Sequence, residues 1–280
     1  MIGSIPGGYD MKKKTIGFIG GGNMATAIIG GILNAGLAAK EQIIAADKME
    51  QALAALQNRF GIHTTQSNQE AAQAADILFL AVKPHILPDA AAEIRDSIGL
   101  DTLLVSIAAG TSISAIESLF GKEITLVRAM PNTPALVGEG MSALCANPNV
   151  SEEALAEACS IFNSFGCCEV VSETMIDTVV GVSGSSPAYV YLFIEAMADA
   201  AVADGMPRAQ AYKFAAQSVL GSAKMVLETG THPGALKDAV CSPGGTTIEA
   251  VAILEEEGLR HAVIRAQRAC VQKSKDMGKQ

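Results

Sequence analysis

Tryptophan is absent from this chain of 280 residues, and Phe, Trp and Tyr together make up only 4% of it. A shortage of large aromatic side chains, beside abundant Ala and 27 Gly, favours closely packed helices over an all-β sandwich. The hydrophobic fraction of 49% is large enough for one extensive core or two smaller ones.

Basic residues are also scarce, and the formal net charge is -9. The one basic run, residues 12–14 (KKK), is too short for a binding patch, so nucleic acid and anionic membrane are not expected partners. No run reaches the roughly 18 apolar residues of a membrane span. Residues 1–11 lack the pattern of a signal peptide, and we expect them to be a disordered extension.

The six cysteines show neither paired spacing nor a spacing with His that would suit a metal, so no metal site is predicted. Reduced thiols in a cytoplasmic protein are the expected state. Cys167 and Cys168 are neighbours and could form a redox pair. The strain of such a disulfide favours two buried thiols instead.

A strand, a glycine turn and a helix follow one another near the start of the chain. Residues 15–19 (TIGFI) are apolar, and a helical pattern begins after Gly20, Gly21 and Gly22. With Ala25 in the third position, this is the G-x-G-x-x-(G/A) turn that binds the pyrophosphate of dinucleotides. A plain turn between a strand and a helix is the alternative.

Further apolar runs are each followed by a turn of small residues or proline. Because the carboxyl ends of parallel strands share one edge, these turns predict a single cofactor groove. At the end of the run 42–46, Asp47 suits the ribose of NAD, whereas Lys48 suits the 2′-phosphate of NADP. Two solvated charges after a strand are the alternative. The runs are residues 42–46, 75–82, 102–106, 123–128, 141–146 and 168–171.

From residue 173 onward the pattern is helical. The sequence therefore predicts an α/β Rossmann-like doubly wound sheet over residues 12–172, followed by an all-helical dimerisation domain over 173–280. Ser186 is expected to cap the first long helix. Residues 189–203 have no clean polar face, which favours burial in an intertwined homodimer. Packing of this half on the first domain is the alternative.

Residues 242–247 (SPGGTT) interrupt the helical half. Proline and two glycines end one helix, and the next begins at Thr246 and Thr247 with free backbone N–H groups. A helix start of this kind suits a carboxylate. An ordinary glycine loop capped by threonine is the alternative.

Taken together, the segments GFIGGGNMA, AVKP, AAG, MPNTP, SGSSPAY and LKDAVCSPGGTTIEAV resemble the pyrroline-5-carboxylate reductase family. The resemblance extends from about Lys14 to the C-terminus. It implies reduction of the C=N bond of L-1-pyrroline-5-carboxylate to L-proline, the last step of proline biosynthesis, with NADPH or alternatively NADH. It also implies a homodimer formed through the helical half, and the family is known to assemble further into decamers.

The resemblance assigns roles to particular positions. Thr247 and Lys83 are expected to be catalytic, Thr247 by orienting the imine nitrogen and Lys83 by positioning the nicotinamide. A solvent-facing cation is the alternative for Lys83. The expected substrate-binding residues are Gly244, Gly245, Thr246, Thr247 and Glu173. The expected cofactor-binding residues are Gly20, Gly21, Gly22, Asn23, Met24, Lys48, Asn68, Ala81, Val82, Lys83, Pro84 and Ala109.

Three positions depart from the family pattern. Ser186 replaces a common glycine, Ala239 stands where an Asn can assist the substrate, and Ala46 stands where a polar residue often meets the 2′-phosphate. The last departure leaves that contact to Lys48. Rival functions are a β-hydroxyacid or 6-phosphogluconate-type dehydrogenase, whose helical lysine is missing after SGSSPAY, and a non-catalytic nucleotide sensor.

Overall fold

The computed structural model describes residues 11–278 and contains two compact units. Unit 1 comprises the described residues up to Gly184 and from Val271 onward, and unit 2 comprises Ser185–Cys270. No helix among the described residues combines the length and apolarity that crossing a membrane requires.

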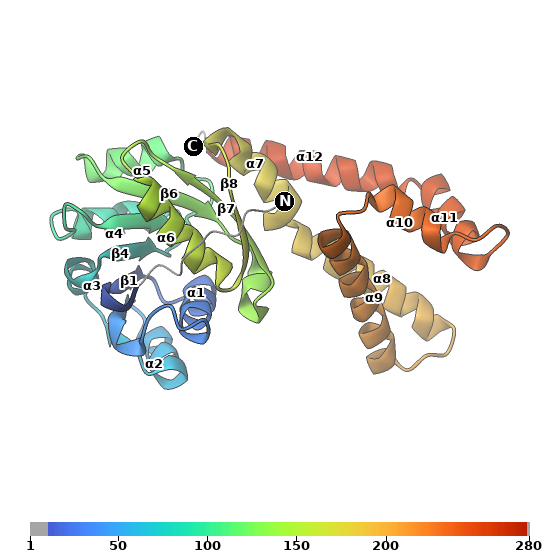
Figure 1. The fold of residues 1–280 in the computed structure, drawn as a ribbon, viewed down its shortest axis with the longest axis horizontal. Coiled ribbons are helices and arrows are strands. Elements are labelled where there is room, and N and C mark those ends of the chain that lie inside the picture. The colour runs from blue at the N-terminus through green and yellow to red at the C-terminus, as the bar shows by residue number, and fades with distance from the viewer. Residues whose placement is uncertain (1–10, 279–280) are drawn as a thin grey trace. The chain divides into compact units, whose positions relative to one another are not determined.

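An eight-stranded sheet in the order β3-β2-β1-β4-β5-β6-β7-β8 forms the centre of unit 1 (Figure 1). Neighbouring strands are parallel except β6 and β7, which are antiparallel. The inner strands β1, β2, β4 and β5 are buried along their whole length, as expected of parallel strands covered on both faces. The strands are β1 (Ile16–Ile19), β2 (Ile43–Ala46), β3 (His63–Thr65), β4 (Ile77–Leu80), β5 (Leu103–Ser106), β6 (Thr125–Met130), β7 (Gly140–Ala146) and β8 (Gly166–Val170).

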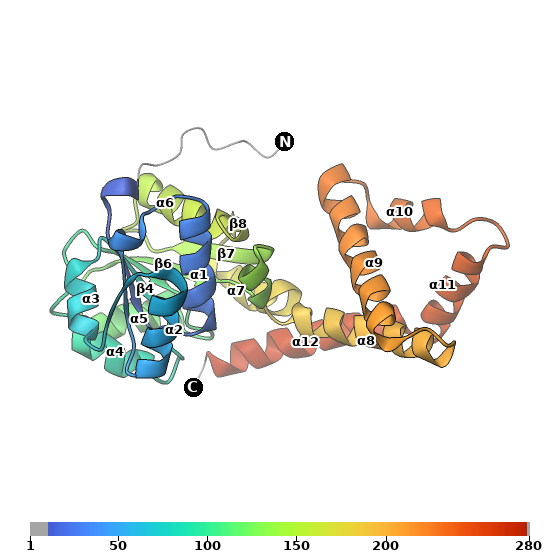
Figure 2. The same ribbon diagram turned by 90° about the horizontal axis from the view of Figure 1, so that it is seen from below.

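Helices cover both faces of the sheet, each through its own apolar core. One face is covered by α1 (Asn23–Asn34), α2 (Glu50–Phe60) and α6 (Glu152–Asn163). The other is covered by α3 (Asn68–Ala74), α4 (Leu87–Ile94) and α5 (Ile113–Phe120), with α7 (Ile176–Val179) beside them. Figure 2 shows α3 and α4 together, with α1 and α6 apart from them. This arrangement confirms the predicted doubly wound α/β fold.

The short helical segments connect the larger elements, and one of them corrects a prediction. Met11 is only 1% exposed and packs into the core, so it is not part of a disordered extension. Residues 1–10 of the predicted extension lie outside the described residues. The short segments are η1 (Met11–Lys13), η2 (Lys40–Gln42), η3 (Thr133–Val137), η4 (Glu173–Met175) and the π-helical η5 (Val180–Gly184).

Unit 2 is helical throughout. It contains α8 (Ser186–Ala203), α9 (Arg208–Thr229), α10 (Pro233–Val240), α11 (Thr246–Glu256) and the first part of α12 (Leu259–Met277). Helices α8 and α9 pack against one another. The N-cap of α8 is Ser185, and Ser186 is the first helical residue, so the prediction that Ser186 caps this helix was wrong by one position.

The strands end and the helices begin near residue 173, as the sequence predicted. The boundary between the two compact units lies further along the chain, between Gly184 and Ser185. Segments η4, α7 and η5, residues 173–184, belong to unit 1. The reason is that β6 and the turn after it hold this stretch: Arg128 donates to Glu173, and Asn132 donates to the carbonyl of Ser183.

Candidate active site

The glycine turn between β1 and α1 has a shape that only glycine permits. Gly20 has a φ of 103°, and a Cβ there would lie 2.6 Å from the carbonyl oxygen of Ala81. Gly22, in contrast, has nothing within 4 Å of an added Cβ. Gly20 therefore allows the chain to cross close to the end of β4, while Gly22 leaves open space beside the backbone.

The amino end of α1 offers unpaired backbone donors beside that open space. Gly22 is the N-cap and makes no side-chain cap bond, and the first turn contains no acidic residue. The helix is 12 residues long, so its positive end is well developed. Free N–H groups, a positive end and close access are what a pyrophosphate requires, and this part of unit 1 therefore fits a dinucleotide.

Asp47, directly after β2, braces the glycine turn. One oxygen of its carboxylate, Oδ2, accepts a hydrogen bond of 2.7 Å from the backbone N–H of Gly21. The other, Oδ1, accepts one of 2.8 Å from the N–H of Met49. Asp47 was expected to be a ribose contact or a solvated charge, and nothing in the local pattern indicates this structural role.

A cluster of polar side chains lies beyond Asp47. Lys48 Nζ donates to both carboxylate oxygens of Glu93 on α4, at 2.9 and 3.0 Å. Asn68 Nδ2, at the start of α3, donates to Glu93 Oε2 at 2.6 Å. The hydrogen bond from Lys48, more than that from Asn68, holds the pKa of Glu93 below its usual value against the opposing effect of burial. Lys48 and Asn68 were predicted from the sequence, and Glu93 was not.

The remaining predicted cofactor residues follow β4 and β5. Strand β4 lies between β1 and β5, and the N–H of Ala81 donates to the carbonyl of Ile19 at 2.8 Å. Val82 and Pro84 are half-buried, whereas the Lys83 and Ala109 side chains are exposed. Because β2, β1, β4 and β5 are parallel neighbours, all the predicted cofactor residues lie along one edge of the sheet. Their contacts with a cofactor stay a prediction.

Glu173 was expected to bind substrate, and its carboxylate already has partners within unit 1. Glu173 Oε1 accepts hydrogen bonds from Arg128 Nη1 at 2.8 Å and from the N–H of Ile113 at 2.7 Å. The Arg128 side chain is 10% exposed and that of Glu173 35%. Glu173 therefore joins the segment after β8 to β6 and to the start of α5. Its role toward substrate stays a prediction, and Arg128 is a residue that sequence analysis missed.

Asn132, in the MPNTP turn after β6, also joins separate segments. It is 8% exposed, its Nδ2 donates to the carbonyl of Ser183 at 3.0 Å, and its Oδ1 accepts from the N–H of Met141 at 2.9 Å. The end of η5 is therefore fixed to the turn that follows β6.

The expected substrate-binding loop lies in unit 2, at the start of α11. Gly244 has a φ of 67°, so the backbone favours glycine there, whereas a Cβ on Gly245 would lie 2.4 Å from Ser242 Oγ and would displace that hydroxyl. Gly245 is the N-cap and makes no side-chain cap bond. Within the described residues, the hydroxyls of Thr246 and Thr247 make no hydrogen bond. This helix start therefore has donors available, although Glu249 in its first turn is a competing carboxylate.

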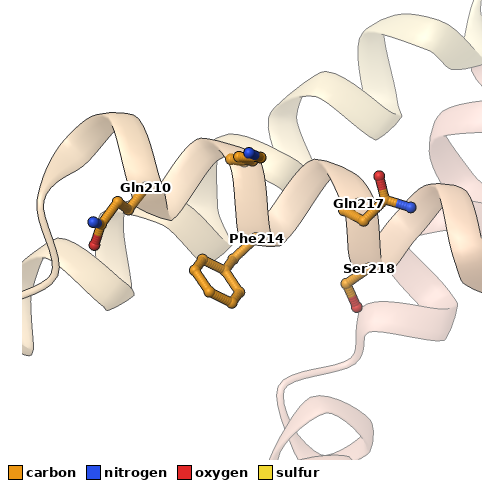
Figure 3. A pocket seen from close by; sticks show the side chains of 5 residues that line it. Gln210, Phe214, Gln217 and Ser218 are labelled. Carbon is orange, nitrogen blue, oxygen red and sulfur yellow. The ribbon is translucent and has the colours of Figure 1, made fainter.

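A hollow of about 700 Å³ lies along one side of α9 in unit 2. Its lining residues all belong to this helix, and Figure 3 shows four of them, Gln210, Phe214, Gln217 and Ser218, along it. A closed ligand site draws side chains from several elements. We therefore interpret this hollow as an uncovered helix face.

The cysteines do not form disulfides within the described residues. Burial raises the pKa of the Cys145 thiol to about 11. Cys168 is half-buried, but Cys167 is exposed because alternate residues of the edge strand β8 face solvent. The expectation that both neighbouring thiols are buried was therefore wrong for Cys167. Among residues 11–278, no three His, Cys, Asp or Glu side chains gather as a metal site would require.

Each half of the chain matches a known protein family. Residues 15–110 match the family described as NADP oxidoreductase coenzyme F420-dependent, and residues 173–277 match the pyrroline-5-carboxylate reductase dimerisation family. Pyrroline-5-carboxylate reductase of Escherichia coli strain K12 is 57% identical over 269 residues, which cover 96% of this chain and all of that protein. This chain belongs to the pyrroline-5-carboxylate reductase family.

Solved structures of pyrroline-5-carboxylate reductases extend the similarity to the whole fold. The structure from Coxiella burnetii is 38% identical with a TM-score of 0.89, and covers 96% of this chain and all of that one. The structure from Plasmodium falciparum, which has NADP bound, is 36% identical with a TM-score of 0.85, and covers 96% of this chain and 99% of that one.

Membership of the pyrroline-5-carboxylate reductase family confirms the predicted family, activity and cofactor class. The chain is an NAD(P)H-dependent oxidoreductase that reduces the C=N bond of L-1-pyrroline-5-carboxylate to give L-proline, the last step of proline biosynthesis. The matched dimerisation family indicates an oligomer.

Proposed function

We propose that this reductase performs its reaction with two groups of residues: one edge of the sheet in unit 1 for the cofactor, and the start of α11 in unit 2 for the substrate. The observation that carries the proposal is the glycine turn, where the uncapped end of α1 adjoins the open space at Gly22. A pyrophosphate needs both features at one place.

On this proposal, the backbone from Gly20 to Met24 binds the pyrophosphate of the cofactor. Lys48 and Asn68 then face the adenosine half of the cofactor. Val82, Lys83 and Ala109 face the nicotinamide half. The groove is also lined by Gly21, Ala81 and Pro84. The exposed ammonium of Lys48 favours NADPH over NADH, because it is a cation at the end of β2. When bound, the cofactor supplies the hydride.

The substrate is an acid whose ring nitrogen is protonated in the reactive form. The backbone N–H groups of Gly244, Thr246 and Thr247 are suited to its carboxylate, while Gly245 shapes the turn through the bond of its own N–H to the carbonyl of Ser242. The Thr247 hydroxyl is suited to accept the hydrogen bond of the iminium. Holding the ring in this way fixes its C=N carbon for hydride transfer without a strong general acid. Lys83 positions the nicotinamide. Glu173 contributes to substrate binding by holding the segment after β8 in place.

We propose a homodimer formed through the helical half. Apolar side chains of α8 and α9 are exposed in the single chain, among them Tyr191 at 60%, Leu192 at 68% and Phe214 at 67%. A second copy of these helices would bury such surface. Further assembly of dimers into a decamer is the alternative, and the molar mass in solution distinguishes the two. Six cysteines without a disulfide among the described residues are in keeping with a cytoplasmic location.

A steady-state assay tests the proposed function. Purified protein is mixed with L-1-pyrroline-5-carboxylate and either NADPH or NADH, and the absorbance of the reduced cofactor is followed. We expect both to be consumed, with the higher kcat/KM for NADPH. Absence of consumption with both cofactors, despite measurable binding, would instead support a nucleotide sensor.

A further inference from the structure

A carboxylate lies between the two side chains that we expect at the adenosine end of the cofactor groove. Glu93 accepts hydrogen bonds from Lys48 through both oxygens and from Asn68 through Oε2. Its backbone carbonyl also accepts from Gln69 Nε2 at 3.2 Å. Glu93 therefore joins the end of β2 to the start of α3, although it is 45 residues from Lys48 in sequence.

The neighbouring acidic residue does not take part in this arrangement. Both oxygens of Asp47 accept backbone N–H groups, one from Gly21 and one from Met49. Lys48 and Glu93 therefore pair with one another, while the Asp47 carboxylate is directed to the backbone. The pair has no net charge, and both side chains are accessible to solvent, at 65% and 39%.

A 2′-phosphate reaching Lys48 would meet an ammonium that is already paired. Such a phosphate carries nearly two negative charges at neutral pH. The Glu93 carboxylate would repel it and would compete with it for the same donor. An NADH molecule, which has a hydroxyl at this place, meets no such competition.

We propose that Glu93 is a positioning residue that sets the preference between NADPH and NADH by competing with the 2′-phosphate for Lys48. The inference rests on the proposed placement of the adenosine half of the cofactor at Lys48 and Asn68. Because the pair is exposed to solvent, the competition is modest, and we expect its removal to change affinity about fivefold.

Glu93→Gln is the substitution that isolates the charge. Gln has nearly the same shape and keeps an oxygen that can accept from Asn68, but it carries no negative charge. Asp89→Asn is the matched control. Asp89 lies one helical turn earlier on the same face of α4, is exposed, and makes no bond to Lys48.

Calorimetric titration with two fragments tests the inference without turnover. Adenosine 2′,5′-bisphosphate carries the 2′-phosphate, and adenosine 5′-monophosphate lacks it. We expect Glu93→Gln to bind the bisphosphate about fivefold more tightly while its affinity for the monophosphate is unchanged. Lys48→Gln should weaken binding of the bisphosphate alone and should abolish the effect of Glu93→Gln in the double variant. Asp89→Asn should match the wild type, and added salt should reduce the gain.

Separate outcomes overturn the inference and the placement beneath it. If Lys48→Gln and Asn68→Ala both leave the two fragments binding as in the wild type, the proposed placement of the cofactor fails. If those variants alter binding but Glu93→Gln leaves the ratio of the two affinities unchanged, the placement of the cofactor stands and only the inference about Glu93 fails. It also fails if the gain persists in the Lys48→Gln background, if Asp89→Asn reproduces it, or if Glu93→Gln weakens both fragments equally.

Discussion

The Asp47 carboxylate accepts a hydrogen bond from the backbone N–H of Gly21, with 2.7 Å between Oδ2 and the nitrogen. This bond joins the end of β2 to the middle of the glycine turn. The turn is therefore fixed from two sides, by Asp47 on one and by the close contact of Gly20 with Ala81 on the other. A loop held in this way loses little further freedom when a pyrophosphate binds.

Removing the Asp47 brace should weaken binding of either reduced cofactor. We expect Asp47→Ala to raise the Kd of both NADPH and NADH about tenfold, since an unpaired N–H and a looser turn cost about 1–2 kcal/mol. Asp47→Asn keeps an acceptor for Gly21 and should lose less. Fluorescence titration measures both constants. Unchanged affinity in Asp47→Ala would show that the brace does not matter for the cofactor.

Gly20 and Gly22 should respond to the same substitution in different ways. Gly20→Ala meets the Ala81 carbonyl at a left-handed φ, so we expect a loss of about 2–4 kcal/mol in the free energy of unfolding. Gly22→Ala has room, and its stability should stay within about 0.5 kcal/mol of the wild type while cofactor affinity falls. Denaturant unfolding and cofactor titration separate the two effects. Normal cofactor binding by Gly22→Ala would contradict the pyrophosphate assignment.

Thr247 should matter for turnover and not for the cofactor. We expect Thr247→Ala to lower kcat by about tenfold to a hundredfold, because a hydrogen bond to a charged group contributes about 1.5–3 kcal/mol. The Kd of NADPH should not change. Thr246→Ala, on the adjacent residue, is the control and should retain more activity. Equal kcat values for Thr247→Ala and the wild type would remove Thr247 from the chemistry.

The pair of Arg128 and Glu173 should contribute to stability. Arg128 is nearly buried, and Arg128→Met leaves the Glu173 carboxylate with only the N–H of Ile113 as a partner. We expect the free energy of unfolding to fall by about 2–3 kcal/mol. This is less than for a fully buried pair, because Glu173 is partly solvated. Glu173→Gln keeps an acceptor for both donors and should cost less. A large rise in the KM for substrate in Glu173→Gln, without loss of stability, would favour the substrate-binding role instead.

Much of the fold could be predicted because buried parallel strands are continuous apolar runs. Residues 75–82 were expected as a strand, and β4 occupies Ile77–Leu80 within them. Proline and glycine likewise mark helix limits, since α10 begins at Pro233 and α12 lies between Gly258 and Gly278. Strand β3, His63–Thr65, was missed because a short, polar edge strand has no apolar pattern to indicate it.

The residues of the candidate site also fall into those that could be predicted from the sequence and those that could not. The glycine turn and the start of α11 follow from residues that are adjacent in sequence, so their local chemistry could be predicted. Glu93 and Arg128 could not be selected, because their partners lie 45 residues away and only the folded sheet brings them together. Asn132 was singled out only as part of a turn, and its bond to Ser183 across 51 residues was not foreseeable.

A crystal structure with NADPH and proline bound together tests the account most directly. We predict that the pyrophosphate contacts the backbone N–H groups from Gly22 to Met24. The carboxylate oxygens of proline should lie within hydrogen-bonding distance of the N–H groups of Gly244, Thr246 or Thr247. A carboxylate bound elsewhere, or a pyrophosphate away from the start of α1, would contradict it.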